Sequence, residues 1–105
     1  MSANCKFTLY NLIMIKSFLH KGVQAFFETG SKAGIRPDHA KRLRLVLQRL
    51  DAASAPADMN VPGWKLHLLS HDLNGHWAVS VNANWRITFA FEGEDAILVD
   101  YQDYH

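Results

Sequence analysis

The sequence predicts an α+β fold in which two N-terminal helices pack on one face of a mostly antiparallel sheet of four or five strands. The C-terminal third contains short segments of alternating apolar and polar residues separated by turn residues, a pattern typical of half-buried antiparallel strands. Residues 37–53 instead repeat apolar side chains at three- and four-residue steps, the period of a helix. Helices and strands fall in separate runs along the chain, which favours α+β over an alternating α/β fold.

The C-terminal strands form the best-defined part of the predicted sheet. They comprise residues 77–81, 85–91 and 96–101. Successive side chains of a strand point to opposite faces, which predicts a buried face made of Trp77, Val79, Val81, Trp85, Ile87, Phe89, Phe91, Ile97, Val99 and Tyr101. Ser80, Arg86 and Thr88 are then expected on the face away from the core.

Two helices are predicted before this sheet. The first covers residues 21–29 and ends at Gly30, because glycine readily adopts the left-handed conformation after a helix. The second covers residues 37–53 and opens at Pro37. Its predicted buried stripe is Ala40, Leu43, Val46, Leu47 and Leu50. The remaining surface carries Lys41, Arg42, Arg44 and Arg49, and such a charged helix face is most often simply solvated.

Three weaker elements complete the predicted fold. Residues 13–19 are expected to form a first strand that pairs with the C-terminal sheet, and residues 54–63 a loop with a helical turn at 57–59. Residues 64–69 are expected to form a further strand. In that strand Trp64, Leu66 and Leu68 would be buried, and Lys65 and His67 would point outward.

Length and composition indicate one domain. A chain of 105 residues that is 49% hydrophobic can bury a core without disulfides. The single cysteine, Cys5, excludes an intramolecular disulfide and agrees with a reducing cytosol. No apolar run approaches the roughly 18 residues of a membrane-spanning helix, so we expect a cytoplasmic protein without membrane contact. Met14 can itself be a start, which predicts a domain at 14–105 and an extension of unassigned role at 1–13.

The net charge of +1 conceals an asymmetry between the two halves of the chain. Residues 1–50 contain nine Lys or Arg and two acidic residues, whereas residues 51–105 contain two and eight. A basic half is the electrostatic signature of a polyanion-binding protein. The alternative is that the two halves neutralise each other in the fold.

The outward side of the predicted sheet carries residues suited to phosphodiester chemistry. It would display His67 and Arg86, with the tail Asp103, Tyr104 and His105 nearby. RNA supplies its own nucleophile, the 2′-hydroxyl, so a protein needs only a base, an acid and a positive charge. The histidines, Asp103 and Tyr104 could divide the proton transfers, Arg86 could hold the phosphate, and Tyr104 could stack on a base. Neither a metal nor another cofactor is required.

Less specific interpretations remain open for the same residues. Arg86 could be an ion-pair partner of Asp100, His67 an ordinary surface residue, and His105 a frayed chain end. His67, His71 and His76 are also candidate ligands for a zinc ion. Because no cysteine joins these histidines and their spacing is not helical, a metal site is not favoured.

In these segments the chain resembles the HigB toxins of HigBA toxin-antitoxin systems, within the RelE/ParE toxin superfamily. The resemblance covers residues 14–105. Its motifs are Met14-Ile15-Lys16-Ser17-Phe18, Ala25-Phe26-Phe27-Glu28-Thr29-Gly30, Ala40-Lys41-Arg42-Leu43, Pro62-Gly63-Trp64-Lys65-Leu66-His67, Gly75-His76-Trp77, Val81-Asn82-Ala83-Asn84-Trp85-Arg86-Ile87-Thr88-Phe89 and Val99-Asp100-Tyr101-Gln102-Asp103-Tyr104-His105. The chain departs from the family at Leu69-Ser70-His71, where a basic residue and a glycine are common.

The resemblance implies a RelE-like fold and a toxin that inhibits translation as an mRNA endoribonuclease (an mRNA interferase). Cleavage would occur in the A site of the 70S ribosome without metal. A HigA-like helix-turn-helix antitoxin would neutralise the toxin and provide its contact with operator DNA. Arg86 would bind the phosphate, while His67, Asp103, Tyr104 and His105 would supply the catalytic and base-stacking groups. The expected RNA- and ribosome-binding cations are Lys41, Arg44 and Lys65.

Two other functions are compatible with the sequence. One is a non-enzymatic toxin of the ParE kind, which binds a target such as DNA gyrase. ParE-like chains usually lack a terminal Tyr-His pair, so Tyr104 and His105 favour the nuclease. The other is an interaction module that only pairs with an antitoxin and operator DNA.

Overall fold

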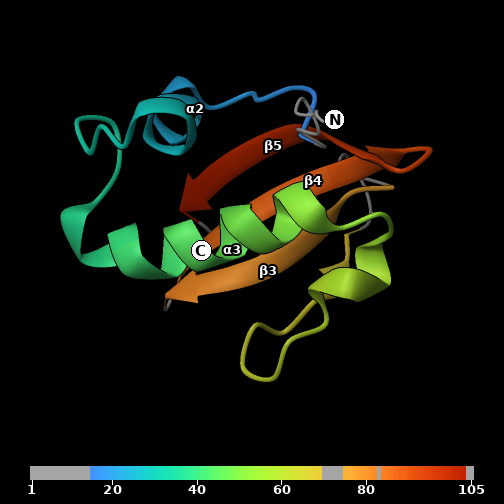
Figure 1. Ribbon diagram of the computed structural model, residues 1–105. Coiled ribbons are helices and arrows are strands. Elements are labelled where there is room, and N and C mark those ends of the chain that lie inside the picture. Colours follow the sequence, from blue (N-terminus) through green and yellow to red (C-terminus); the bar gives the residue numbers. More distant parts are fainter. Residues whose placement is uncertain (1–14, 70–74, 83, 104–105) are drawn as a thin grey trace.

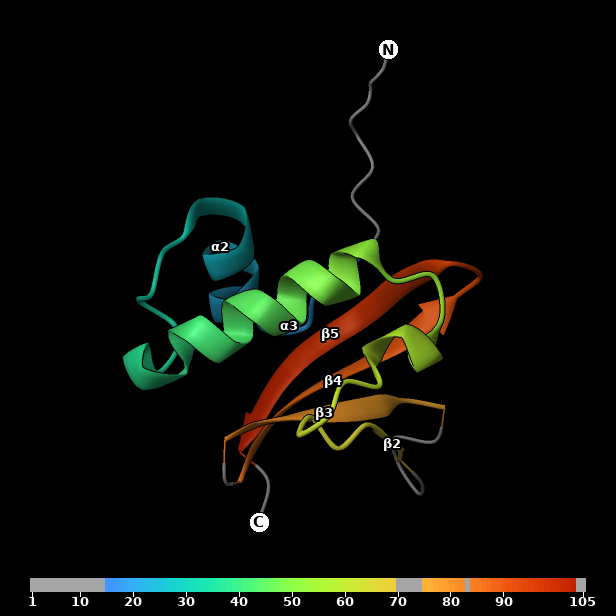
Figure 2. The ribbon, with the colours of Figure 1, turned by 60° about the horizontal axis from the view of Figure 1, so that its bottom comes forward.

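Two layers make up the fold, with helices on one side and a sheet on the other (Figures 1 and 2). The computed structural model describes residues 15–69, 75–82 and 84–103. The helices are α2 (Lys21–Thr29) and α3 (Ala40–Ala52), with short 3-10 turns η1 (Pro37–His39) and η2 (Pro56–Met59). The strands are β2 (His67–Leu68), β3 (Trp77–Asn82), β4 (Trp85–Glu92) and β5 (Asp95–Asp103). They form one antiparallel sheet in the order β2-β3-β4-β5, which confirms the predicted α+β architecture.

The first helix, α2, has a defined cap at each end. At its start, Nδ1 of His20 accepts a hydrogen bond from the Val23 backbone N–H at 3.1 Å. At its end, Gly30 has φ 82° and donates its N–H to the Phe26 carbonyl, as left-handed C-terminal glycines do. Val23 and Phe26 are buried beneath the helix. The predicted bounds of 21–29 and the stop at Gly30 are both confirmed.

The second helix, α3, lies across the sheet and provides most of the helical half of the core (Figure 1). Pro37 opens the preceding turn η1, and α3 then runs to Ala52. The five residues predicted for its stripe are all buried: Ala40, Leu43, Val46, Leu47 and Leu50. None of the described helices is long and apolar enough to span a bilayer.

A bulge in β5 changes which of its residues face the core. Phe91 pairs with Ala96 and Ala90 with Ile97, but Thr88 already pairs with Asp100, so β5 gains a residue near Leu98. Leu98 has φ 56°, and its N–H donates to Oγ of Ser17 at 2.8 Å. Such a bulge reverses the alternation before it. The burial predicted for Ile97 was therefore wrong, and the fully buried Ala96 takes that place.

The N-terminal segment pairs with β5 without forming a regular strand. Ile15 and Phe18 form isolated parallel bridges with Ala96 and Val99. The Lys16 N–H donates to the Ala96 carbonyl at 2.7 Å, and the Leu19 N–H donates to the Val99 carbonyl at 2.7 Å. The predicted pairing with the C-terminal sheet is confirmed over residues 15–19. Residues 13 and 14 lie outside the described part of the chain.

The segment before β3 forms less strand than predicted. Only His67 and Leu68 belong to β2, because Lys65 has φ 56°, which no regular strand permits. Trp64 is buried as predicted, but Leu68 is 55% exposed because β2 is a short edge strand beyond the reach of the helical layer. Thr88, expected on the outward face, is only 1% exposed, since its short side chain lies in the middle of the sheet between two flanking strands.

Candidate functional site

The sheet presents Arg86 on the face opposite the helices. Directly paired residues of antiparallel strands lie on the same face, and Arg86 pairs with Ser80 on β3 and Gln102 on β5. Its neighbours along β4 behave differently: Ile87 is fully buried, and the Trp85 ring lies against Tyr101 on the helix side. The predicted orientation of Arg86 away from the core is therefore confirmed.

Two hydrogen bonds connect Arg86 with the neighbouring strand. Nη2 of Arg86 donates to the Gln102 side-chain oxygen at 3.2 Å. The amide nitrogen of Gln102 donates in turn to a carboxylate oxygen of Asp100 at 2.9 Å. Gln102 thus stands between the guanidinium and the acid that the sequence suggested as its ion-pair partner. These two hydrogen bonds orient the guanidinium on β4, a strand that pairs with β3 on one side and with β5 on the other.

His67 lies on the same face, two strands away. It pairs with Ala78, which pairs with Thr88, which pairs with Asp100. Thr88 and Arg86 are two positions apart on β4, so their side chains point to the same face. The residues paired with each of them share that face. Standard spacings between strands and along a strand place the Cα atoms of His67 and Arg86 roughly 12 Å apart. His67 and Arg86 thus lie on one face of the sheet, with β3 between their strands.

The hydrogen bond of the His67 ring assigns its neutral tautomer. Nδ1 of His67 lies 2.8 Å from the Lys65 backbone carbonyl, which can only accept. Nδ1 must therefore carry the hydrogen, and in the neutral ring Nε2 is the unprotonated nitrogen. The ring is exposed, so Nε2 can approach a solvent-borne substrate. The left-handed conformation of Lys65 helps to bring its carbonyl to the ring.

The described part of the C-terminal tail ends at Asp103. Asp103 pairs with Trp85, whose ring lies on the helix side of the sheet. The register therefore places Asp103 at the end of the sheet and out of the row that contains Arg86. Its side chain is exposed. Tyr104 and His105, the other predicted tail residues, lie outside the described residues.

A buried aromatic cluster supports the end of β5 from the helix side. Nδ1 of His39 and the Tyr101 hydroxyl are 2.6 Å apart, and the Tyr101 ring lies 4.6 Å from the Trp85 ring. Burial lowers the pKa of His39 and raises the pKa of Tyr101. His39 is only 2% exposed and was missed from the sequence. Its position four residues before Leu43, in line with the apolar stripe of α3, was the available signal.

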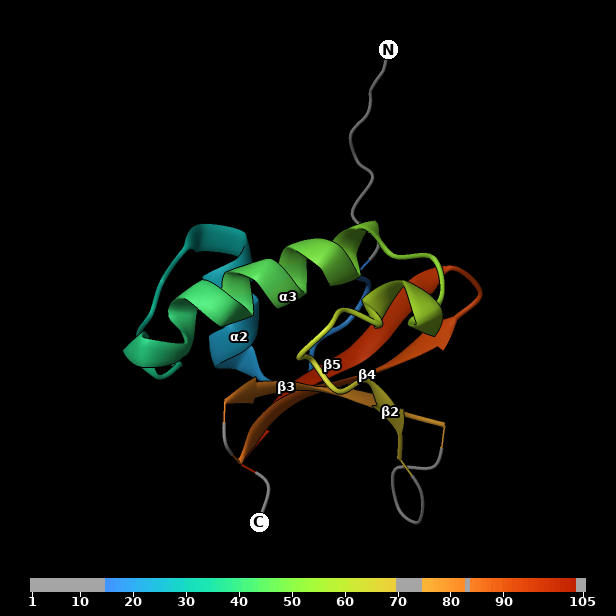
Figure 3. The same cartoon turned by 90° about the horizontal axis from the view of Figure 1, so that it is seen from below.

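The predicted ribosome-binding cations do not share one surface. Lys65 is exposed beside His67. Lys41 and Arg44 belong to α3, which lies in the helical layer on one side of the sheet (Figure 3), whereas Arg86 faces the other side. The Arg44 guanidinium lies 5.6 Å from the centre of the Phe26 ring. The structure thus brings His67 and Arg86 to one face and places the two helix cations in the other layer.

The described residues do not form a metal-binding site. They contain no group of three or more His, Cys, Asp or Glu side chains arranged to hold an ion. His71, one of the three candidate zinc ligands, lies outside the described residues. Arg86 supplies a guanidinium on the sheet face away from the helices, which suits recognition of a phosphate.

A two-layer α+β scaffold with an arginine and a histidine on the sheet face away from the helices agrees with the RelE-like toxin class that the sequence resemblance implies. Comparison with protein families agrees, since the model of the RelE-like toxin of the type II toxin-antitoxin system HigB matches residues 16–105. The chain belongs to this HigB-like toxin family.

A characterised relative shows similarity over nearly the same range. The endoribonuclease HigB of Proteus vulgaris is 44% identical over 92 residues, which cover 88% of this chain and 100% of the relative.

Proposed function

We propose that this toxin is a ribosome-dependent mRNA endoribonuclease that stops translation by cutting the message in the ribosomal A site. Membership of the HigB-like family makes the chain a type II toxin, and its relative from Proteus vulgaris is an endoribonuclease. The observation that carries the proposal is the placement of Arg86 and His67 on one open sheet face, each oriented by a hydrogen bond.

The proposed reaction uses the RNA as its own nucleophile. A base removes the proton of a 2′-hydroxyl, and the 2′-oxygen attacks the adjacent phosphorus. The bond from phosphorus to the 5′-oxygen then breaks as an acid protonates that oxygen. The products are a 2′,3′-cyclic phosphate and a 5′-hydroxyl, so no metal, oxidant or water is consumed in this step.

Each described residue fits one part of this reaction. Nε2 of His67 can accept the 2′-hydroxyl proton because Nδ1 holds the ring hydrogen. Arg86 can stabilise the charge that develops on the phosphorane, and its planar fork can bind two phosphate oxygens at once. Lys65 adds a second positive charge beside His67. The remaining roles, protonation of the leaving oxygen and base stacking, are assigned to Asp103, Tyr104 and His105.

The partners follow from this assignment. A type II toxin has a cognate antitoxin, which we propose to be a HigA-like helix-turn-helix protein that also makes the contacts with operator DNA. The substrate complex is the 70S ribosome carrying mRNA, which places the toxin in the cytoplasm.

Cleavage of a defined message on programmed ribosomes tests the proposal. The purified toxin is expected to cut the message in the A site, and mapping of the ends should reveal a 2′,3′-cyclic phosphate upstream and a 5′-hydroxyl downstream. An Arg86→Ala, His105→Ala double variant separates this function from non-enzymatic, ParE-like binding. Growth arrest should disappear in the double variant, whereas unchanged arrest would favour binding of a target such as DNA gyrase.

A further inference from the structure

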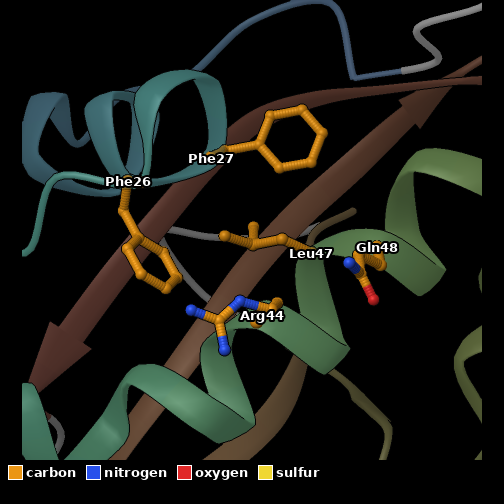
Figure 4. Close-up of a pocket in the computed structure, with 6 residues that line it drawn as sticks. Phe26, Phe27, Arg44, Leu47 and Gln48 are labelled. Atoms are coloured by element: carbon orange, nitrogen blue, oxygen red, sulfur yellow. The ribbon is translucent and has the colours of Figure 1, made fainter.

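A cavity lies between α2 and α3, in the helical layer of the fold (Figure 4). Its volume is about 200 Å³. Phe26 and Phe27 line it from α2, and Arg44, Leu47 and Gln48 line it from α3. An apolar cavity of about 150 Å³ is enough to accommodate benzene. The cavity is therefore large enough for one aliphatic or aromatic side chain, with a guanidinium and an amide at its rim.

A more open groove of about 390 Å³ lies on the other side of the same helix. Its lining includes Leu45, Gln48 and Arg49 of α3, together with Val61 and Trp64 from the segment that follows η2. Gln48 contributes to both hollows. We refer to the outward residues Arg44, Leu45, Gln48 and Arg49, with the two hollows beside them, as the α3 surface.

Leu45 marks the α3 surface as an apolar contact site. It is 50% exposed, although leucine favours burial. It adjoins the groove instead of standing alone among charges. Hollows with apolar walls and an exposed aliphatic side chain between them are typical of surfaces that bind a protein segment.

Arg44 and Lys41 give the α2 side of the α3 surface a positive charge, whereas Arg49 on the groove side lies next to Asp58. In the part of the chain that the structure describes, neither Arg44 nor Lys41 has a carboxylate within ion-pair distance. Arg49 donates from Nε to the Asp58 backbone carbonyl at 2.7 Å, which fixes its side chain beside the groove. The complement of such a surface is a segment that combines apolar side chains with carboxylates. An RNA backbone would use the cations but leave the apolar hollows unfilled.

We infer that the α3 surface docks an acidic, amphipathic segment of the cognate antitoxin. One apolar side chain of that segment would fill the α2–α3 cavity, and a second would pack on Leu45 in the groove. Its carboxylates would pair with Arg44 and Lys41. The inference rests on the assignment of the chain as a type II toxin, and it concerns the layer opposite Arg86 (Figure 3).

Calorimetric titration of the purified toxin with its purified antitoxin tests this inference without ribosomes. Leu45→Glu and Arg44→Glu are each expected to raise the Kd at least tenfold, because each places a carboxylate against the acidic segment. Leu19→Glu and Lys16→Glu are matched controls: Leu19 and Lys16 are exposed and lie on the segment beside β5. The controls should change the Kd less than twofold. Lys41 and Arg49 flank position 45 one turn away on either side, so Leu45→Glu should not unfold α3, which thermal unfolding checks.

Unchanged antitoxin affinity in both Leu45→Glu and Arg44→Glu would overturn the inference. A parallel measurement of ribosome binding distinguishes the main alternative. If Arg44→Glu weakens ribosome binding while antitoxin affinity stays the same, the α3 surface is an RNA site and the inference is wrong. Because neither measurement depends on cleavage, a failure of the proposed nuclease activity would leave the antitoxin result interpretable.

Discussion

Arg86 and Gln102 pair across the ladder between β4 and β5, and the guanidinium donates a hydrogen bond from Nη2 to the Gln102 amide oxygen at 3.2 Å. Gln102 in turn donates to Asp100, so a neutral amide separates the guanidinium from that carboxylate. The amide therefore fixes the position of one guanidinium nitrogen on the face of the sheet away from the helices.

Gln102→Ala should slow mRNA cleavage because Arg86 loses the hydrogen bond that orients it. We expect a loss of about tenfold, which corresponds to about 1.4 kcal/mol and is typical of one hydrogen bond to a charged group. Initial rates on programmed ribosomes measure the effect. Gln24→Ala, on α2 in the helical layer, is the matched control and should cleave at the wild-type rate.

Gln102→Glu provides a sharper test of the same relationship. The substitution places a carboxylate next to Arg86 and should compete with the phosphate for the guanidinium. Cleavage should fall further than in Gln102→Ala. An activity above that of Gln102→Ala would mean that Arg86 does not contact the phosphate.

His67→Gln should remove the proposed base while keeping a polar side chain on β2. A loss of about 10²- to 10⁴-fold in the single-turnover cleavage rate is expected for a general base. Ribosome binding should be retained, because Lys65 and Arg86 are unchanged. A rate within threefold of wild type would assign the base to another residue and return His67 to the role of a surface residue.

His39 should make the stability of the fold depend on pH. Burial lowers its pKa in the folded state below the ordinary value of about 6.5. The unfolded chain therefore binds a proton that the folded chain does not as the pH falls below that value. The contribution of this residue to stability is complete above about pH 6.5 and is progressively lost toward the folded-state pKa. Urea unfolding of wild type and His39→Leu at pH 7.5 and 5.5 measures it, and the variant should lose less stability on acidification.

Gly22→Ala should destabilise the packing of α2 on the connector to α3. A methyl group at position 22 would collide with the carbonyl oxygen of Gly34, which is backbone and cannot move aside as a side chain would. We expect a cost of about 1–3 kcal/mol in the free energy of unfolding, as for other overpacked sites. Ala25→Ser, on the same helix, is a mild control. Equal free energies of unfolding for Gly22→Ala and wild type would show that the backbone can shift to relieve the close contact between positions 22 and 34.

The helices and the main strands could be predicted from the sequence because their patterns are local. Gly30 ends α2 by its own conformational freedom, and the stripe from Ala40 to Leu50 has a helical period. The bulge at Leu98 could not be predicted, because it depends on a hydrogen bond to Ser17, which lies 81 residues away. The outward orientation of Arg86 was predictable from alternation, since the bulge lies beyond it in the ladder.

The orienting contacts of the candidate site lay beyond sequence reasoning for a similar physical reason. The contact of His67 with the Lys65 carbonyl requires a left-handed residue where the alternation suggests a strand. The hydrogen bonds that Gln102 makes with Arg86 and Asp100 depend on the register between β4 and β5. The separation of Arg44 from Arg86 depends on which face of the sheet α3 covers. The distribution of charged residues along the sequence does not indicate that face.

The cleavage rate of a defined message on programmed ribosomes, compared for wild type, Arg86→Ala and the surface control Lys16→Ala, tests the central claim most directly. Removal of one donor that stabilises transition-state charge typically costs about 10²- to 10³-fold. Wild type and Lys16→Ala should cut the message at the same A-site position and rate, whereas Arg86→Ala should lose activity by at least that factor. An intact message with stoichiometric wild-type toxin, or equal rates for wild type and Arg86→Ala, would contradict the account.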